Sequence, residues 1–297
     1  MSIIGLDIGY FASKDHTGRI YQSAITKKEN SLANNKIQID GVVYTVGQGT
    51  MTSEMDKTDS DINKVLTLYG LALSKITDPL LVVGLPVAQF ETQKQKLFDN
   101  ILSYNKSKVV YKKNEFKVNI KDVIVAPQGI AALYVLPNLY GEYIVIDIGG
   151  GTLDIAYIEF DITGIKIIMF DTWYKGVRTV YSDIIKEVNN THKLKLDNSH
   201  AEKILREGLY IDEVKQDLTF LKPILQEYVD SIVDEIKIKY PYRTTPIYLV
   251  GGGAELLYNP LTKRFPKVTK IPNPQFANAL GYYVMGTVKF AERGYRI

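Results

Sequence analysis

Aspartates that precede glycine turns are the residues in this sequence whose types and spacing suit chemistry on a phosphorylated ligand. Asp147 and Ile148 end an apolar run, residues 143–148, that predicts a buried strand. A four-residue turn follows: Gly149, Gly150, Gly151 and Thr152. Consecutive glycines lack Cβ atoms, so their backbone N–H groups can approach an anion and form a concavity around it.

The same arrangement occurs once more in the chain, and a third glycine turn follows another apolar run. Residues 4–9 repeat residues 144–149, so that Asp7 and Asp147 lie 140 residues apart. The first turn consists of Gly9, Tyr10, Phe11 and Ala12. A third turn follows the apolar run 247–250 and consists of Gly251, Gly252, Gly253 and Ala254. One Asp-Ile-Gly turn alone is usually a plain hairpin, but two matched copies and a third glycine turn indicate a binding site.

Strands and helices on both sides of these turns must position them. Alternation and β-branched content predict strands at residues 3–8, 13–16, 19–25, 80–83, 153–158 and 165–172, and a hairpin at residues 37–46. Apolar spacing predicts helices over residues 61–76, 90–104, 218–239 and 273–289. The repeat implies two similar α/β domains that share a cleft.

Composition and charge exclude several classes of protein. The 297 residues contain no cysteine, which excludes a disulfide framework and thiolate chemistry. The sequence shows neither a signal peptide nor a run close to the ~20 apolar residues of a membrane span, so we expect a cytoplasmic protein without a membrane partner. The net charge of +3 has no clear basic face, so direct nucleic-acid binding is not expected.

With these motifs the sequence resembles the actin-like ATPase superfamily. Residues 7–9 and 147–152 resemble its two phosphate motifs, residues 251–254 its adenosine motif, and residues 126–129 and 278–281 its two connecting motifs. The resemblance implies an α/β fold of two domains with a nucleotide cleft between them. Domain I would comprise residues 1–140, with the C-terminal helix, 273–297, returning to it, and domain II would comprise residues 141–272.

Within that superfamily the sequence looks closest to the ParM-like plasmid-segregation actins. The opening residues 5–14 and the phrases at residues 42–47 and 82–87 carry this resemblance. It implies a filament-forming ATPase that segregates plasmid DNA. The partners would be further copies of the chain and a DNA-binding adaptor of the ParR type.

The resemblance also implies roles for single residues around ATP and Mg²⁺, with GTP as the alternative nucleotide. Asp7 and Asp147 would face the metal through its waters, because Mg²⁺ gives up its waters reluctantly. Lys14 would neutralise the terminal phosphate oxygens. Gln128 would orient the attacking water, and both hairpin turns would grip the phosphates. Gln128, Asp7 and Asp147 are therefore the expected catalytic residues.

The nucleoside is expected to lie against a helix and the third glycine turn. Glu202 would accept hydrogen bonds from the ribose, Lys203 or Arg206 would border the base, and residues 251–254 would approach it through their backbone. Charged residues on a helix are usually its solvated face, so this part rests on the resemblance alone. Two further questions stay open: Asp154 either supports the metal waters or caps a strand, and Tyr10 and Phe11 point either into the cleft or into domain I.

Two other functions of the same superfamily compete with the filament. A small-molecule kinase would share every phosphate motif but would need a carboxylate base beside the acceptor hydroxyl, and the sequence shows no clear substrate loop for one. A chaperone-type ATPase is disfavoured because the sequence shows no C-terminal substrate-binding domain.

Overall fold

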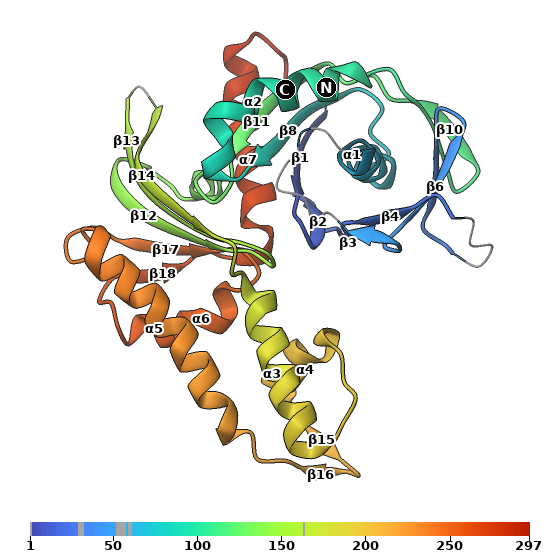
Figure 1. Cartoon of the computed structure of the whole chain (residues 1–297). Helices are drawn as coiled ribbons and strands as arrows, with labels where there is room; N and C mark the ends of the chain where they lie inside the picture. The colour runs from blue at the N-terminus through green and yellow to red at the C-terminus, as the bar shows by residue number, and fades with distance from the viewer. Residues whose placement is uncertain (1, 29–32, 52–57, 59–60, 163) are drawn as a thin grey trace.

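Two lobes form the molecule, and each is built around a sheet that ends in one of the Asp-Ile-Gly hairpins (Figure 1). The computed structural model describes residues 2–28, 33–51, 58, 61–162 and 164–297. The first sheet has the order β11-β8-β1-β2-β3. Its strands are β1 (Ser2–Ile8), β2 (Ala12–Asp15), β3 (Ile20–Gln22), β8 (Pro79–Leu85) and β11 (Asp122–Pro127). Strands β1, β8 and β11 are parallel, so the residues that follow them meet at one edge.

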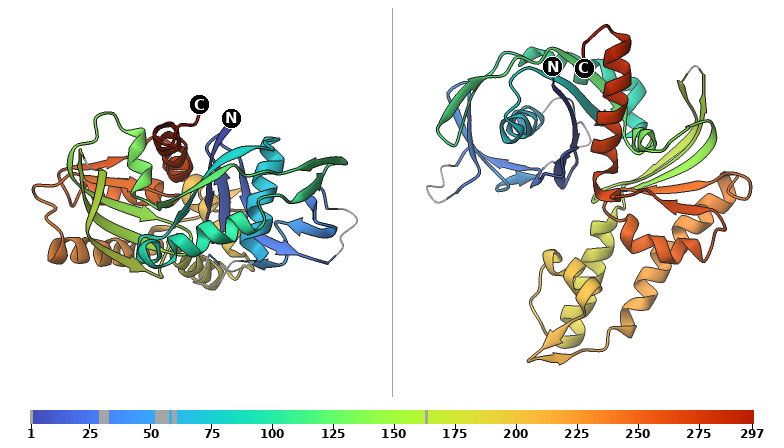
Figure 2. Two further views of the ribbon diagram at one scale, coloured as in Figure 1. Left: turned by 90° about the horizontal axis from the view of Figure 1, so that it is seen from above. Right: turned by 180° about the vertical axis from the view of Figure 1, so that it is seen from behind.

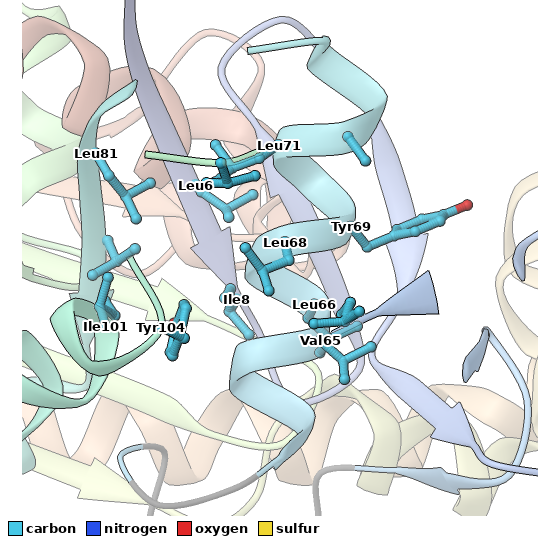
Figure 3. Packing of buried hydrophobic residues seen from close by; sticks show 14 of the residues in the cluster. Leu6, Ile8, Val65, Leu66, Leu68, Tyr69, Leu71, Leu81, Ile101 and Tyr104 are labelled. Atoms are coloured by element: carbon cyan, nitrogen blue, oxygen red, sulfur yellow. The ribbon is translucent and has the colours of Figure 1, made fainter. Parts of the chain in front are cut away.

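A second sheet of the first lobe closes over helix α1 (Asp61–Ser74), which Figure 1 shows inside a ring of strands. The order of this sheet is β10-β9-β5-β6-β4-β7. Its strands are β4 (Ala24–Thr26), β5 (Lys36–Ile39), β6 (Val42–Val46), β7 (Thr50–Met51), β9 (Lys108–Tyr111) and β10 (Asn114–Lys117). Leu66, Leu68 and Leu71 of α1 are fully buried against Leu6 of β1 (Figure 3). This core fixes β1, and therefore Asp7, from one side.

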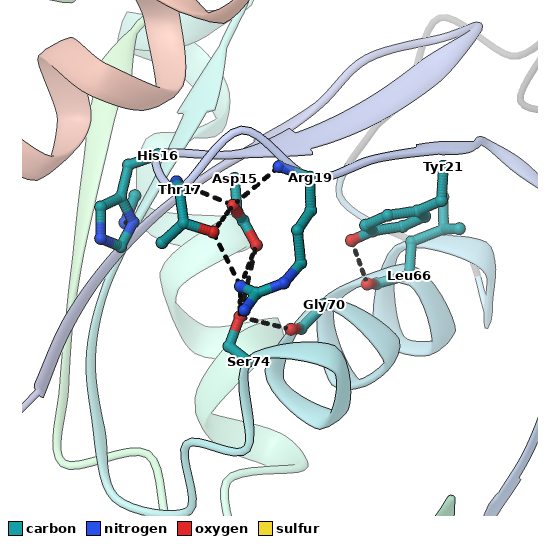
Figure 4. A network of polar contacts seen from close by, with 9 residues as sticks. Asp15, His16, Thr17, Arg19, Tyr21, Leu66, Gly70 and Ser74 are labelled. Carbon is teal, nitrogen blue, oxygen red and sulfur yellow. Dashed lines mark hydrogen bonds and ion pairs between the residues drawn. The ribbon is translucent and has the colours of Figure 1, made fainter. Parts of the chain in front are cut away.

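A polar network around the buried Asp15 ties the far end of the first hairpin to α1 (Figure 4). Asp15 accepts hydrogen bonds from the Thr17 hydroxyl at 2.6 Å, from the Arg19 guanidinium at 3.0 Å and from the Ser74 hydroxyl at 3.3 Å. Burial raises the pKa of Asp15, but the hydrogen bonds from Thr17 and Arg19 outweigh it, so the pKa lies below its usual value. These hydrogen bonds therefore hold the hairpin at the end opposite its turn, and they leave the turn free to contact a ligand.

The second lobe repeats the plan with a sheet of order β14-β13-β12-β17-β18. Its strands are β12 (Gly141–Ile148), β13 (Leu153–Asp161), β14 (Gly164–Trp173), β17 (Ile247–Val250) and β18 (Val268–Lys270). Helices α5 (Lys222–Lys239) and α6 (Ala254–Thr262) pack on one face. Beyond them lie α3 (Val177–His192), α4 (Ala201–Glu207), the short strands β15 (Tyr210–Ile211) and β16 (Val214–Lys215), and the 3-10 turns Asn198–His200 and Thr219–Leu221.

Helix α7 (Ala277–Glu292) runs between the two lobes in both views of Figure 2. Tyr282 and Phe290 of α7 are fully buried against the face of the first sheet that is opposite α1. A Cβ atom on Gly5 of β1 would overlap the Ala279 carbonyl oxygen, so only glycine lets helix and strand approach this closely. Three further elements complete the packing: helix α2 (Val87–Ser103), the 3-10 helix Ala131–Val135, and the 3-10 turn Pro274–Phe276 that precedes α7.

Most expected elements are present, with a few differences. The prediction of a single strand at residues 19–25 is wrong. The chain leaves the first sheet at Ser23 and continues as β4 in the second sheet. The Oγ of Ser23 lies 3.0 Å from the Oγ of Ser13. The hairpin at residues 37–46 forms with positive φ at Asp40 and Gly41. Among the residues that the structure describes, no helix has the length and apolar character needed to cross a bilayer.

Candidate functional site

Each motif aspartate faces a charged residue directly across its own hairpin. The first hairpin (β1 and β2) pairs Asp7 with Lys14, and the second hairpin (β12 and β13) pairs Asp147 with Asp154. The Lys14 Nζ lies 3.7 Å from Oδ2 of Asp7. The seven-residue spacing in both copies is thus the spacing of a cross-strand pair. The first pair brings a cation to the turn, whereas the second brings a further carboxylate.

The second glycine turn presents a row of backbone amides. The carbonyl oxygens of Gly149, Gly150 and Gly151 accept hydrogen bonds of 3.0–3.1 Å from the first three amides of α3 and its cap, residues 176–178. In a planar trans peptide the N–H points away from the C=O of the same unit. The N–H groups of Gly150, Gly151 and Thr152 therefore point away from α3. Three donors on the same side of a turn can form a concavity for an anion.

This arrangement also decides which end of the helix–turn pair can bind phosphate. The first amides of α3 are already donated to the turn, so the helix N-terminus is not available as an anion site. Gly149 donates its own amide to the Thr152 carbonyl at 2.9 Å and closes the turn. Of the expected phosphate-gripping residues in this turn, Gly150, Gly151 and Thr152 are the ones whose amides fit that role.

Gln128 lies against the first motif aspartate. It follows β11, and its Nε2 donates a hydrogen bond of 3.2 Å to Oδ1 of Asp7. Gln128 is buried, and Tyr282 of α7 is its neighbour. Burial raises the pKa of the Tyr282 hydroxyl well above 10, and the charges of Asp7 and Asp147 raise it further. The structure thus brings Asp7, Lys14 and Gln128 together, as the sequence predicts.

Asp147 is held by Asn278, the first residue of the connecting motif at residues 278–281, to which the sequence analysis gave no role of its own. Asn278, at the start of α7, donates from Nδ2 to Oδ2 of Asp147 at 2.8 Å and accepts from the Gly129 amide at 2.8 Å. Burial raises the pKa of Asp147 to about 7; the Asn278 hydrogen bond opposes this, while the charges of Asp154 and Asp7 reinforce it. Asp147 therefore needs a nearby cation to be fully ionised at neutral pH.

A hydrated magnesium ion fits these carboxylates better than a directly ligated one. Among the described residues, no three His, Asp or Glu side chains group closely enough to enclose a metal ion. Asp7 and Asp147 are linked across the lobes, because Asp7 accepts a hydrogen bond from Gln128, while Asn278 bonds both the next amide, that of Gly129, and Asp147. Both are buried, at 5% and 7% exposure. Two carboxylates on opposite sides of a gap suit an ion that keeps most of its waters.

The carboxylate of Asp154 accepts hydrogen bonds from two hydroxyl groups. Its Oδ1 accepts from Thr172 at 2.5 Å and its Oδ2 from Thr152 at 3.2 Å. It therefore anchors the last residue of the glycine turn to the next strand. This geometry favours the structural interpretation of Asp154 over direct support of metal waters.

Tyr10 and Phe11 both face the other hairpin. A Cβ atom built on Gly150 would lie 3.1 Å from the Phe11 Cβ, and one on Gly151 would lie 3.7 Å from the Tyr10 Cβ. The Arg178 guanidinium of α3 lies over the Phe11 ring, 5.4 Å from its centroid. The two turns therefore meet tip to tip, and the aromatic residues narrow the gap between the lobes.

Comparison with known proteins identifies the family that shares this architecture. A family model described as the N-terminal domain of actin-like proteins matches residues 5–130. A model described as the C-terminal domain of the archaeal MreB-like actin homologue matches residues 145–263. Together the two matches span most of the chain, in the order of the two lobes. The chain belongs to the actin-like superfamily.

Solved actin-like structures share the fold at low sequence identity. An archaeal actin homologue superimposes with a TM-score of 0.84 and 22% identity, covering 97% of this chain and 100% of that one. The same kind of homologue in complex with ADP gives 0.80 and 24%, covering 99% and 100%. A 15-stranded ParM filament from Clostridium botulinum gives 0.73 and 23%, covering 97% and 100%. No curated protein sequence matches the chain. The expected two-domain actin-like α/β fold is thus confirmed.

The third glycine turn of this actin-like chain contains glycines of two kinds. Added Cβ atoms on Gly251 and Gly253 would meet Asp147 or Ile148, so these two glycines let the turn pack against the second hairpin. Gly251 also has a φ of +84°. Gly252 is exposed, with only Gln275 within 4 Å of its Cβ position. Gly252 is therefore where a ligand could approach the backbone.

The helix residues expected at the nucleoside lie on α4 and contact one another. Arg206 pairs with Glu207 at 2.8 Å and with Glu202 at 3.9 Å, and all three are exposed. Lys203 is exposed on the same helix. Glu202 also lies near Tyr181 of α3, and within the described residues these contacts do not reach the glycine turns. A nucleoside role for Glu202, Lys203 and Arg206 therefore remains a prediction.

A separate hollow of about 860 Å³ lies at the contact of the two lobes, away from the glycine turns. Its wall comes from β14, α2 and α7, and includes Ile167, Phe90 and Met285. Pro127 faces this hollow, while the next residue, Gln128, reaches Asp7. The actin-like site is therefore defined by polar geometry at the strand ends and not by this apolar hollow.

Proposed function

We propose that this actin-like protein is an ATPase that forms filaments in a nucleotide-dependent manner. The observation that carries the proposal is the row of three amides, at residues 150–152, that points away from α3. In the other lobe, Lys14 and Gln128 both contact Asp7, which lies just before the first glycine turn. That turn contacts the second turn, which carries the three amides. A polyphosphate between the turns would meet donors from one lobe and a cation from the other.

The proposed chemistry assigns a task to each of these groups. Bound Mg²⁺ would supply positive charge to the phosphate oxygens. Asp7 and Asp147 would hold its waters, and Lys14 would offset the charge of the terminal phosphates. Gln128 would orient the attacking water by hydrogen bonds. Because a carboxamide is not a strong base, we expect slow hydrolysis.

The carboxylates at the site favour hydrolysis over transfer to a small molecule. Asp7 is paired with Lys14 and Gln128, Asp147 with Asn278, and Asp154 with Thr152 and Thr172. A small-molecule kinase needs a carboxylate that is free to accept the proton of an acceptor hydroxyl. Each of these three already has partners, which supports the ATPase over the kinase.

The filament and its partners extend the proposal. One similar structure is a ParM filament, and another is an archaeal actin homologue in complex with ADP. We propose that the chain assembles with copies of itself when ATP, or GTP, is bound with Mg²⁺. We further propose that a DNA-binding adaptor of the ParR type links the filament to a plasmid in the cytoplasm. The same proposal places domain I at residues 1–140 with 273–297, and domain II at residues 141–272.

Light scattering and pelleting test the proposal directly. Purified protein at tens of micromolar is mixed with Mg²⁺ and ATP, ADP, GTP or a non-hydrolysable ATP analogue at several salt concentrations, and phosphate release is followed in parallel. We expect assembly with ATP and with the analogue, and slow phosphate release with ATP. A protein that stays monomeric and releases ADP only when a small acceptor is added would instead be a kinase.

A further inference from the structure

Among the residues that the structure describes, Arg178 differs from most arginines in lacking a carboxylate partner. Within the described residues, Arg19, Arg206, Arg264 and Arg293 each form an ion pair of 3.0 Å or less. The side chain of Arg178 is instead exposed and rests on the Phe11 ring. An exposed contact between a cation and an aromatic ring is weak, so this guanidinium is available to a stronger partner.

The position of Arg178 places that guanidinium at the meeting point of the two hairpins. Its backbone amide donates to the Gly150 carbonyl at 3.1 Å, which fixes the residue on the second turn. Its side chain then passes over Gly150, where an added Cβ would lie 3.7 Å from the Arg178 Cδ. Phe11 belongs to the first turn. Arg178 therefore bridges the lobes beside the amides of residues 150–152.

Distance from the third glycine turn decides which phosphate Arg178 could reach. Gly251 and Gly253 pack against Asp147 and Ile148, the last strand residues before the turn of the second hairpin. Arg178 lies over Gly150, at the tip of the same hairpin. A nucleotide whose base lies at Gly252 would therefore present its last phosphate, and not its first, to Arg178.

We propose that Arg178 is the residue by which this protein distinguishes a nucleoside triphosphate from a diphosphate. This inference rests on the proposed function, because it requires a nucleotide between the hairpins. Without a triphosphate the guanidinium rests on Phe11. With one, its planar fork donates two hydrogen bonds to the terminal phosphate, which is a stronger, charge-assisted contact. The contact between the lobes then runs through the nucleotide and no longer through the Phe11 ring.

Binding affinity, measured by calorimetry with Mg²⁺, tests the assignment without relying on turnover. We expect Arg178→Ala to weaken binding of a non-hydrolysable ATP analogue about tenfold or more and binding of ADP less than about twofold. Arg178→Lys, which keeps the charge but loses the fork, should be intermediate. Lys175→Ala removes an exposed cation from the loop just before α3 and should leave both affinities unchanged.

A second variant, Phe11→Leu, tests the contact between the Phe11 ring and Arg178. Because the ring competes with phosphate for Arg178, we expect this change to raise the affinity for the analogue about two- to threefold in an otherwise wild-type protein. In a protein that also carries Arg178→Ala, the same change should have no effect on that affinity. Equal losses for the analogue and ADP in Arg178→Ala, or a loss of analogue binding in Phe11→Leu, would overturn the assignment while leaving the nucleotide site intact. Wild-type protein that binds neither ligand would overturn both the assignment and the proposed function.

Discussion

Asn278 donates a hydrogen bond of 2.8 Å to the carboxylate of Asp147, so a helix that packs on the first sheet fixes the acidic tip of a strand in the second sheet. The same side chain accepts the Gly129 amide beside Gln128. The two motif regions are thereby connected through one buried carboxamide. Because Asn278 and Gly129 both belong to the proposed domain I, a movement of the lobes about this point would act on the hydrogen bond to Asp147 and not on the one to Gly129.

Replacing Asn278 tests that connection. Asn278→Ala leaves the Gly129 amide and Asp147 without their partner, and we expect the free energy of unfolding to fall by about 1–3 kcal/mol. Nucleotide turnover should fall as well, because Asp147 loses its orientation. Chemical denaturation and phosphate release measure the two effects. Asn190→Ala, an exposed helical position, is the matched control and should change neither.

The pKa of Asp147 predicts how stability depends on pH without nucleotide. In the unfolded chain this carboxyl titrates near 3.8, but in the folded protein near 7. Between these values the folded protein holds a proton that the unfolded chain has lost, so this contribution to stability falls as pH rises toward 7. Asp147→Asn removes the titration and keeps an acceptor for Asn278. We expect its melting temperature to exceed that of the wild type by about 3–6 °C at pH 8.

The same comparison at low pH is the control for that prediction. Near pH 4.5 the folded wild type carries a protonated Asp147, so the two proteins should melt within about 2 °C of each other. Asp147→Asn should also lose nucleotide turnover at every pH. An equal gain in melting temperature at pH 4.5 and pH 8 would assign the stabilisation to packing and not to the buried charge.

Gln128→Ala separates hydrolysis from binding. The carboxamide donates to Asp7, which keeps other partners, so we expect nucleotide affinity to stay within about twofold while phosphate release slows about 10- to 100-fold. Assemblies formed with ATP should then persist longer in light scattering. Gln95→Ala, an exposed position on α2, should behave as the wild type. If Gln128→Ala abolishes binding, the side chain holds the site together and does not act on water.

Gly252 and Gly253 form a matched pair of substitutions. An alanine at position 253 would overlap the Ile148 side chain, and we expect it to lower the free energy of unfolding by about 1–3 kcal/mol. An alanine at position 252 meets open space, so stability should be nearly unchanged. If the nucleoside approaches the backbone there, nucleotide affinity should still fall several-fold. Unchanged affinity in Gly252→Ala would move the base away from this turn.

The local features of the site could be predicted from the sequence. Asp7 and Asp147 stand at the ends of apolar runs, and each turn shows its glycines directly, so hairpins with amides facing a ligand were expected. The spacing from Asp7 to Lys14 was also visible, although its meaning as a cross-strand pair depends on the hairpin register.

Contacts between distant segments could not be predicted in the same way. Arg178 and Phe11 are far apart in the sequence, and nothing local distinguishes Arg178 from other helical arginines. Asn278 was visible only as the first residue of a connecting motif, while its bonds to Asp147 and Gly129 depend on how α7 crosses the lobes. The strand expected over residues 19–25 failed because its alternating pattern does not reveal a change of sheet at Ser23.

The packing of α7 on β1 also bears on how the protein is synthesised. β1 leaves the ribosome some 280 residues before Tyr282 and Phe290, which cover it. At about 5–20 residues per second, Ile3 and its neighbours on β8 wait on the order of tens of seconds for their cover. During that interval a nascent chain exposes a strip of β-branched side chains, so this protein should depend on ribosome-associated chaperones more than its size suggests.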